Sequence, residues 1–339
     1  MFTRQLLQWN RKNNQREMPW KGIRDPYKIW LSEIILQQTR VDQGLKYYKT
    51  ISAKYPSIKH LAKANEQELF TLWQGLGYYN RCRNMLYTAK FIVDNYHGVF
   101  PHQYQQIREL KGIGDYTAAA IASFAFDLPY AVVDGNVIRV LSRYFSLDQD
   151  PQSSAGKKVF ASKAAQLLSK KYAAEYNQAI MDLGAEICKP QNPACTDCPL
   201  QKNCQAFKHK AIKQFPFKKV KRKVLERAFQ FFVLEEGAYF YITKRLEKDI
   251  WQDLYTFPSV EMNEEMKKPA YITSFPFQQP IVISQLLTHQ RITGHFFIIH
   301  TFNRLEIKES SLIKIKKSQI KDYAFPKLMM TFFKNYHYL

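Results

Sequence analysis

The sequence contains little cysteine, no long apolar run and few acidic residues, and each shortage excludes a class of protein. Only five of the 339 residues are cysteine, which argues against the disulfide framework of a small secreted protein. The most apolar run, residues 118–126, soon meets Asp127 and Pro129 and is too short to span a bilayer. Residues 1–20 lack the apolar segment of a secretory signal. We therefore expect a soluble cytosolic protein.

The shortage of acidic residues produces the strongest bulk feature of the chain. Aspartate and glutamate number 29 against 50 lysines and arginines, so the formal net charge is +21. Basic side chains that neutralise phosphates release counterions from a nucleic acid, and the surplus therefore favours such a partner. An anionic membrane surface is the alternative, but no basic amphipathic anchor helix is evident.

The composition of the chain changes along its length. Residues 1–207 show a helical pattern with short turns, and Asp25 followed by Pro26 is a typical helix start. Residues 208–225 are rich in lysine and arginine, as in an exposed basic linker. Residues 226–339 are rich in aromatic and β-branched residues, which predict strands and a short helix near the C-terminus. We expect a mostly α domain, a linker and an α+β domain. Further helices are expected at residues 66–73, 81–95, 116–126, 136–144, 156–171 and 176–186.

A glycine-containing turn lies between two of these helical patterns. Its sequence, LKGIGDYTAAA, begins at Leu110 and includes Gly112 and Gly114. Two glycines allow a tight turn and let backbone N–H groups approach a phosphate at a helix N-terminus. Such a helix–hairpin–helix binds one DNA strand without reading its bases, although an ordinary helix–helix turn has the same pattern.

Two carboxyl groups lie in apolar surroundings. Glu33 belongs to the helical segment IWLSEIILQQT, where helical spacing places Ile29 and Leu36 on its face. Burial there would raise its pKa and suit it to general acid catalysis; an exposed glutamate is the alternative. Asp134, in VVDGN, is either a helix N-cap or an ionised carboxylate at the mouth of a cleft. An acid paired with a carboxylate can cleave glycosidic bonds.

Four of the five cysteines lie within seventeen residues: Cys188, Cys195, Cys198 and Cys204. In a cytosolic protein such a group of thiols indicates a metal site. Four thiolates suit either a tetrahedral zinc ion or an iron–sulfur cluster. Zinc sites more often use two separated CxxC pairs, and this group contains one such pair. The fifth, Cys82, is expected to be an inert buried thiol.

Together these segments resemble the helix–hairpin–helix DNA glycosylase superfamily and, within it, the adenine DNA glycosylases (MutY family). The resemblance covers most of residues 1–207, in the segments MPWKGIRDPYKIWLSEIILQQTRV, LWQGLGYYNRCRN, LKGIGDYTAAAIASFAF, VVDGNVIRVLSR and NQAIMDLGAEIC. It implies a DNA glycosylase of base excision repair that hydrolyses the N-glycosidic bond of adenine mispaired with 8-oxoguanine or guanine. The cysteine spacing is similar to that of the family's 4Fe–4S loop, so the resemblance implies this cofactor.

The resemblance also implies catalytic roles. Glu33 corresponds to the acid that protonates adenine N7, and Asp134 to the carboxylate that stabilises the deoxyribosyl cation. Asn136 would hold Asp134 in place. Tyr116 occupies the position where the bifunctional glycosylase/lyases of the superfamily carry a Schiff-base lysine. Without that amine, the enzyme is expected to be monofunctional and to leave an abasic site.

Two further positions imply contacts within the duplex. Gln38 and Tyr78 correspond to family residues that wedge beside the orphaned base when adenine is extruded from the stack. The alternative for Gln38 is an exposed helix residue, and for Tyr78 a core residue. With Leu110, Gly112 and Gly114 they form the expected DNA-binding set of the helical domain.

The C-terminal region resembles the Nudix-like domain appended to this family. Residues 246–261, LEKDIWQDLYTFPSVE, carry the resemblance, but the glutamate-rich magnesium helix of true Nudix hydrolases is missing after them. We therefore expect a module that binds the lesion opposite adenine. The family's F-S-H loop corresponds to Leu287, Thr288 and His289, so the aromatic residue is replaced while the hydroxyl and imidazole groups are retained. The alternative for His289 is an ordinary residue at a strand end.

The expected partner is double-stranded DNA with an A:8-oxoguanine or A:G mispair, bound by a monomer in the bacterial cytosol or nucleoid. Two other functions stay open at this stage. A bifunctional glycosylase/lyase acting on oxidised pyrimidines is disfavoured by Tyr116 and by the extra domain. A lesion-binding protein without catalysis is disfavoured because both carboxyl groups are present.

Overall fold

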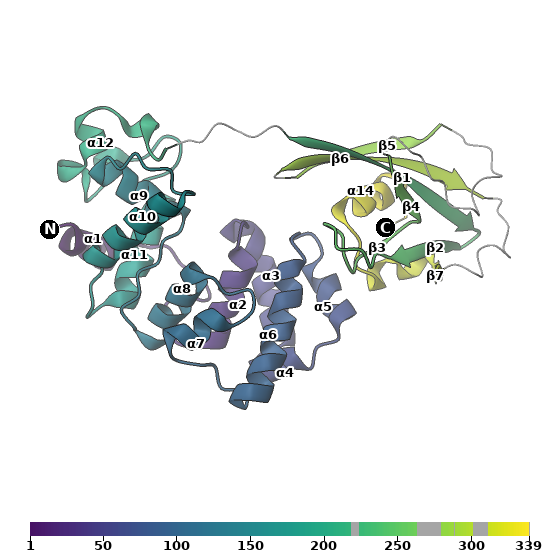
Figure 1. Ribbon diagram of the computed structural model, residues 1–339, viewed down its shortest axis with the longest axis horizontal. Coiled ribbons are helices and arrows are strands. Elements are labelled where there is room, and N and C mark those ends of the chain that lie inside the picture. The colour runs from purple at the N-terminus through teal and green to yellow at the C-terminus, as the bar shows by residue number, and fades with distance from the viewer. Residues whose placement is uncertain (218–223, 263–278, 288, 301–310, 339) are drawn as a thin grey trace. The chain divides into compact units, whose positions relative to one another are not determined.

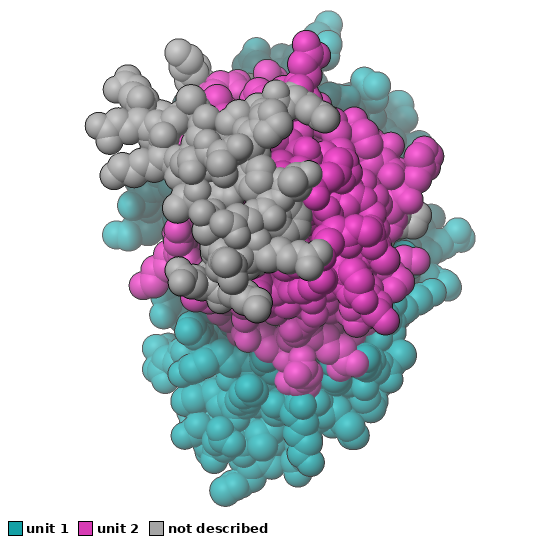
Figure 2. Space-filling view, turned by 90° about the vertical axis from the view of Figure 1, so that its right-hand side faces the viewer, with its two compact units in different colours: residues 1–63, 84–220 teal, residues 64–83, 221–339 magenta. Residues whose placement is uncertain are grey.

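The computed structural model describes residues 1–217, 224–262, 279–287, 289–300 and 311–338. Contacts divide the chain into two units, which Figure 2 distinguishes by colour. Unit 1 comprises Met1–Lys63 and Asn84–Val220, and unit 2 comprises Ala64–Arg83 and Lys221–Leu339. Residues 64–83, part of the expected helical domain, thus share a unit with the C-terminal residues.

The helices follow the predicted pattern closely (Figure 1). The helix expected at 81–95 is α6 (Asn80–Tyr96), and the helix expected at 116–126 is α8 (Asp115–Phe126). The helix expected at 156–171 ends early, because α10 covers Ser154–Leu167 and a turn closes at Ser169, whose hydroxyl accepts a hydrogen bond from the Tyr172 N–H group. The other helices before residue 217 are α1 (Phe2–Asn13), α2 (Pro26–Leu36), α3 (Val41–Lys54), α4 (Ile58–Ala62), α5 (Glu66–Trp73), α7 (Tyr104–Glu109), α9 (Gly135–Phe145), α11 (Ala173–Glu186) and α12 (Gln205–Lys208), with short 3₁₀ turns at Cys195–Asp197, Gln201–Asn203 and Ile212–Gln214.

Two of these helices begin at aspartates that cap them. The Asp25 side chain accepts a hydrogen bond from the Tyr27 N–H group (2.9 Å), and Pro26 occupies the first position of α2. Asp134 Oδ1 accepts a hydrogen bond from the Val137 N–H group (2.7 Å) at the start of α9. The N-cap prediction for Asp134 is confirmed, and the cap fixes the position of its carboxyl group.

The core of unit 1 forms where α8 packs against α2, α7 and α11. The small residues of α8, in TAAAIAS, are buried and let neighbouring helices approach closely. Although α8 is the most apolar run of the chain, no helix in the described part could cross a membrane. Further core residues come from α1, α9, α10 and α11: Leu6, Val137, Leu141, Phe160, Tyr176 and Leu183.

Unit 2 contains α5 and a sheet formed by the C-terminal residues (Figure 1). The described strands follow the order β3-β2-β1-β6-β5, with β4 paired to β1 and β7 to β2. The central strands β1 and β6 are parallel, from Leu225 beside Gln290 to Leu234 beside Ile299. The elements are β1 (Leu225–Glu236), β2 (Tyr239–Lys244), β3 (Tyr255–Thr256), β4 (Ser259–Glu261), β5 (Ile281–Leu286), β6 (Gln290–Ile299), β7 (Ile313–Lys316), the 3₁₀ helix η5 (Lys317–Asp322) and α14 (Lys327–Asn335).

Aromatic side chains form the core of this sheet. Phe296 on β6 stacks on Phe231 of β1, with ring centroids 4.9 Å apart, and on Phe332 of α14 at 4.5 Å. Gly294 leaves room for them, since a Cβ atom there would lie about 3 Å from Phe296, Leu328 and Phe231. The predicted fold, a mostly helical region followed by a strand-rich region with a C-terminal helix, is confirmed.

Candidate active site

A cavity of about 480 Å³ in unit 1 brings together the residues predicted for catalysis. Glu33 from α2, Tyr116 from α8, and Asp134 and Asn136 at the start of α9 all line it, and so does Gln38. The other lining residues are Arg16, Met18, Trp20, Ile29, Ser32, Leu36, Gln37, Thr39, Val41, Phe124, Gly135, Gln178 and Met181.

Glu33 is the buried acid of this cavity. It is 6% exposed, and Ile29 and Leu36 line the cavity beside it. Burial raises the pKa of Glu33 to about 7; a hydrogen bond from the Tyr116 hydroxyl opposes the rise, and the charge of Asp134 adds to it. The predicted burial and the direction of the pKa shift are confirmed. Glu33 is therefore partly protonated at neutral pH.

Asp134 is surrounded by donors that favour its ionised form. Its Oδ1 atom accepts the cap bond from Val137, and its Oδ2 atom accepts a hydrogen bond from Asn136 Nδ2 at 2.7 Å. Burial raises the pKa of Asp134, but these hydrogen bonds and the charge of Arg139 oppose the rise. Among the described contacts, the Tyr116 hydroxyl is the one group that offsets the burial of Glu33, so protonation is favoured on Glu33 over Asp134. Asn136 holds Asp134, as predicted.

Arg139, which was not predicted from the sequence, holds the Asn136 side chain that donates to Asp134. Its Nη2 atom donates to Asn136 Oδ1 (2.7 Å) and to the Gly184 carbonyl group (2.6 Å). Its Nε atom donates to the Cys188 carbonyl group at 2.7 Å. The guanidinium group thus orients the Asn136 amide so that Nδ2 faces Asp134, and it connects Asn136 to the backbone of Cys188, the first clustered cysteine. The signal in the sequence was the three-residue spacing from Asn136 to Arg139 on one helix.

Among the cavity residues that were not foreseen are Arg16 and Gln178. Gln178 donates a hydrogen bond to Asp182 Oδ1 one turn along α11 (3.0 Å), and Arg16 Nη1 donates to the same atom (2.8 Å). Lys21 completes the group through an ion pair with Asp182 (3.0 Å), whose side chain is fully buried. This network attaches residues 16–21 to α11 beside Glu33. Its only sequence signal was an aspartate within an apolar helical pattern.

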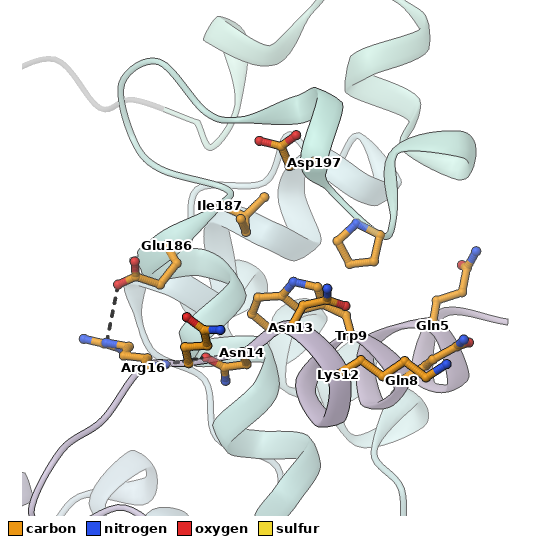
Figure 3. Close-up of a pocket in the computed structure, with 12 residues that line it drawn as sticks. Gln5, Gln8, Trp9, Lys12, Asn13, Asn14, Arg16, Glu186, Ile187 and Asp197 are labelled. Carbon is orange, nitrogen blue, oxygen red and sulfur yellow. Dashed lines mark hydrogen bonds and ion pairs between the residues drawn. The ribbon is translucent and has the colours of Figure 1, made fainter.

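A larger cavity of about 800 Å³ lies between α1 and the residues around the clustered cysteines (Figure 3). Arg16 also reaches this cavity, and there it pairs with Glu186 at 3.6 Å. Its described lining consists mainly of amides and other polar groups and includes none of the predicted site residues. Its acidic residues are Glu186, which is paired with Arg16, and Asp197, so this is not the cavity that the sequence predicted for catalysis.

The predicted hairpin begins at the buried Leu110 and turns at Gly112. Gly112 has φ +83°, and a Cβ atom there would lie 2.9 Å from the Cβ atom of Asn84, so the position requires glycine. Gly114 differs: it has extended backbone as the N-cap of α8, and a Cβ atom would meet nothing within 4 Å. The turn therefore needs only Gly112, and the bare backbone at Gly114 leaves space in front of the N-terminus of α8.

Gln38 and Tyr78 share an uncommon backbone conformation. Gln38 has φ +55° and Tyr78 has φ +49°, both in the left-handed region that non-glycine residues rarely adopt. Gln38 is exposed, as the alternative interpretation expected, although it lies in the turn after the end of α2 and not within the helix. Tyr78 is 48% exposed, so it is not a core residue. Both side chains therefore reach the surface, and the Tyr78 ring also lies under the Arg81 guanidinium group.

A cavity of about 460 Å³ in unit 2 brings Tyr78, Leu287 and His289 together. Residues 75–80 contribute to its lining from one part of the sequence. The C-terminal part contributes residues 249–252, Leu254, residues 285–287, His289 and Gln290. His289 is exposed and directly precedes β6. Thr288 lies outside the described residues. Leu287 supplies an apolar surface where the family pattern has an aromatic ring.

The four clustered cysteines follow α11 on one loop. Cys188, Cys198 and Cys204 pack against the core of unit 1, and Arg143 donates a hydrogen bond to Cys188 Sγ at 3.4 Å. Within the described ranges, no three histidine, cysteine, aspartate or glutamate side chains are arranged around a single metal ion. Cys82 is fully buried, and burial raises the pKa of its thiol well above the usual value, as expected for an inert thiol.

Two protein families match successive parts of the chain. Residues 31–166 match the HhH-GPD superfamily of base excision DNA repair proteins, and residues 230–335 match the NUDIX domain family. The first match contains Glu33, Tyr116 and Asp134; the second contains most of the sheet and α14.

Two similar proteins can be aligned with most of the chain. The adenine DNA glycosylase of Buchnera aphidicola subsp. Acyrthosiphon pisum is 35% identical over 265 residues, which cover 78% of this chain and 76% of that protein. The adenine DNA glycosylase of Homo sapiens is 30% identical and covers 90% of this chain and 65% of that protein.

Solved structures also resemble part of the chain. A thermostable thymine-DNA glycosylase aligns with a TM-score of 0.57 and 29% identity, covering 61% of this chain and 95% of that one. A non-covalent endonuclease III–DNA complex aligns over the same shares with a TM-score of 0.53 and 24% identity, which shows a common fold.

Proposed function

Because the chain belongs to the adenine DNA glycosylase family of base excision repair enzymes, we propose that it removes adenine mispaired with 8-oxoguanine or guanine in duplex DNA and leaves an abasic site. The observation that carries the proposal is the pair of carboxyl groups in one cavity, with Glu33 at a pKa of about 7 and Asp134 surrounded by donors. These two environments support a role for Glu33 as the acid and for Asp134 as the carboxylate.

The chemistry follows from this pair. Glu33 donates its proton to N7 of an extruded adenine, and the N-glycosidic bond breaks with its electron pair remaining on N9. Asp134 stabilises the positive charge that develops on the deoxyribose. Water then adds to C1′, its proton leaves to solvent, and adenine and an abasic site remain. The described cavity lining contains no lysine that could form a Schiff base with the sugar.

The base opposite adenine is proposed to bind in the cavity of unit 2. Tyr78 and Leu287 offer it apolar surface, and His289 offers a polar group at the rim. The NUDIX match and the strand-rich fold of this part support a binding module. The aromatic and apolar lining suits a flat base better than a metal-bound phosphate chain.

The four clustered cysteines are proposed to hold a 4Fe–4S cluster. Four thiolates are its usual ligands, and the spacing of Cys188, Cys195, Cys198 and Cys204 is similar to that of the family's 4Fe–4S loop. When bound, the cluster would tie residues 188–204 into a rigid loop, with Arg143 stabilising the charge on Cys188.

The test is single-turnover excision on a labelled duplex with adenine opposite 8-oxoguanine, with and without subsequent mild alkali. We expect strand cleavage only after alkali, because the enzyme removes the base without a lyase step. Cleavage before alkali would instead establish a glycosylase/lyase. Tight binding without excision would overturn the assignment of Glu33 and Asp134.

A further inference from the structure

The lining of the cavity that contains Tyr78 and His289 comes from distant parts of the sequence. Residues 75–80 form the first segment, and the second segment, residues 249–254, lies more than 160 positions later. Arg83 lies directly after the first segment, on α6, and also lines the cavity. Its Nη2 atom lies 2.5 Å from Asp253 Oδ2 and donates a hydrogen bond to the Gln252 carbonyl group at 3.1 Å. One guanidinium group therefore bonds to the second segment at two adjacent residues.

Arg83 is itself held in place. Its guanidinium lies over the ring of Phe70, 5.8 Å from the centroid, and donates a hydrogen bond to Asn80 Oδ1. The side chains of Arg83 and Asp253 are only 25% and 20% exposed, so water and salt screen their ion pair less than they would a surface pair. Contacts with Phe70 and Asn80 therefore hold the Arg83 side chain in the position where it meets Asp253.

Arg83 bonds to the loop formed by residues 245–254, whose two ends are joined by backbone hydrogen bonds. The Arg245 N–H group donates to the Leu254 carbonyl group (2.9 Å), and the Asp253 N–H group donates back to the Arg245 carbonyl group (2.7 Å). Asp249, in the middle of this loop, accepts two hydrogen bonds from Arg227 of β1, at 3.0 and 3.1 Å. Because the loop is braced at both ends and in the middle, fixing Asp253 also fixes Ile250 and Trp251, which line the cavity.

We propose that Arg83 and Asp253 form a clamp that sets the geometry of the lesion cavity, and that Arg83 is a positioning residue for the preference for 8-oxoguanine over guanine. The inference rests on the proposed function of this cavity. 8-Oxoguanine differs from guanine only at C8 and N7, so discrimination depends on groups held within a fraction of an ångström. Without the clamp, residues 75–80 and the 245–254 loop can separate, and both bases fit equally well.

The experiment compares single-turnover excision of adenine opposite 8-oxoguanine and opposite guanine, in the full chain with its cluster. Arg83→Ala and Asp253→Asn each remove the ion pair, and asparagine tolerates the left-handed backbone at position 253 (φ +66°). We expect the ratio of the two rates to fall about fivefold or more in each variant, while the rate opposite guanine changes less than about twofold. The double variant should lose no more than either single one.

Two further variants separate positioning from folding. Arg83→Lys keeps the charge opposite Asp253 and should restore part of the preference. Arg11→Ala breaks an exposed bidentate ion pair with Glu175 in unit 1 and should leave both rates unchanged. The clamp is overturned if the preference survives Arg83→Ala, or if both rates fall together. A wild-type enzyme without any preference for 8-oxoguanine would instead refute the proposed specificity.

Discussion

The cavity of unit 1 and the cavity of unit 2 have similar volumes, about 480 and about 460 Å³, but opposite chemistry. In the first, burial raises the pKa of Glu33 to about 7 and the carboxyl pair remains without a lysine or arginine salt bridge among the described contacts. In the second, burial would also raise the pKa of Asp249, but hydrogen bonds from Arg227 lower it below its usual value. The cavity of unit 1 thus favours a protonated carboxyl group on Glu33, whereas the cavity of unit 2 favours an ionised Asp249 paired with Arg227.

The two cavities also differ in the secondary structure that supplies their lining residues. The proposed catalytic groups of unit 1 project from helices or helix caps, and Asp134 and Asn136 are held by part-buried hydrogen bonds of 2.7 Å. The lining of unit 2 comes largely from loops, with Tyr78 in a left-handed conformation and His289 exposed. Catalysis requires one exact proton position, whereas recognition requires a surface that a base can enter. Variants in the two cavities should therefore affect different measurements.

The largest effect is expected for Glu33→Gln. Glutamine keeps the size of the side chain but has no acidic proton, so single-turnover excision should fall about 10³-fold, while the dissociation constant for mismatched duplex stays within about threefold. Asp25→Asn is the matched control, because it removes a carboxylate from the same helix and asparagine also caps helices. Normal turnover by the Glu33 variant would show that the acid lies elsewhere.

The next largest effect is expected for Asn136→Ala. This change removes the donor to Asp134 Oδ2 and disconnects Arg139 from the site. A hydrogen bond to a charged group contributes about 1.5–3 kcal/mol, so excision should slow about 10- to 100-fold. Thermal melting monitored by circular dichroism would show whether the fold is intact. Asn95→Ala, which removes an exposed amide from α6, should leave the rate unchanged; an equal loss there would argue against a specific role for Asn136.

The residues of this site also show how much of it could be predicted from the sequence. Glu33 and Asp134 were identified because each combined a carboxyl group with a local pattern, an apolar helical face or a DGN turn, and local patterns survive folding. Asn136 was assigned through the family resemblance, and its hydrogen bond to Asp134 is present. Arg139 was missed because its partners, Gly184 and Cys188, lie more than 40 positions away. Helical spacing says nothing about such distant contacts.

The fold was predictable to a similar degree and for the same reason. Helix starts at Asp25 and strands rich in aromatic residues follow from neighbouring residues alone. The grouping of residues 64–83 with the C-terminal sheet cannot be predicted from neighbouring residues. It depends on contacts such as Gln67 with Asp322 (3.1 Å) and Arg83 with Asp253, between segments that no short pattern connects.

A moderate effect is expected from pH, and only in the chemistry of unit 1. The pKa of Glu33 is raised, so its protonated form predominates below about pH 7 and is lost as the pH rises. Single-turnover excision should fall about fivefold between pH 7 and pH 8. Since both substrates use the same acid, the ratio of excision opposite 8-oxoguanine to excision opposite guanine should stay constant over this interval. A rate that rises with pH would contradict a protonated Glu33.

The smallest effect is expected for His289→Ala, in the cavity of unit 2. His289 lies at the rim and is exposed, so a hydrogen bond from it to the base opposite adenine competes with water and contributes about 0.5–1.5 kcal/mol. The preference for 8-oxoguanine should fall about threefold, with no change in the rate opposite guanine or in the pH profile. His295→Ala is the matched control, since His295 lies on β6 outside the described lining of this cavity. If His289→Ala slowed excision equally opposite both bases, the separation of recognition from chemistry would fail, because a recognition residue would then act on the reacting groups themselves.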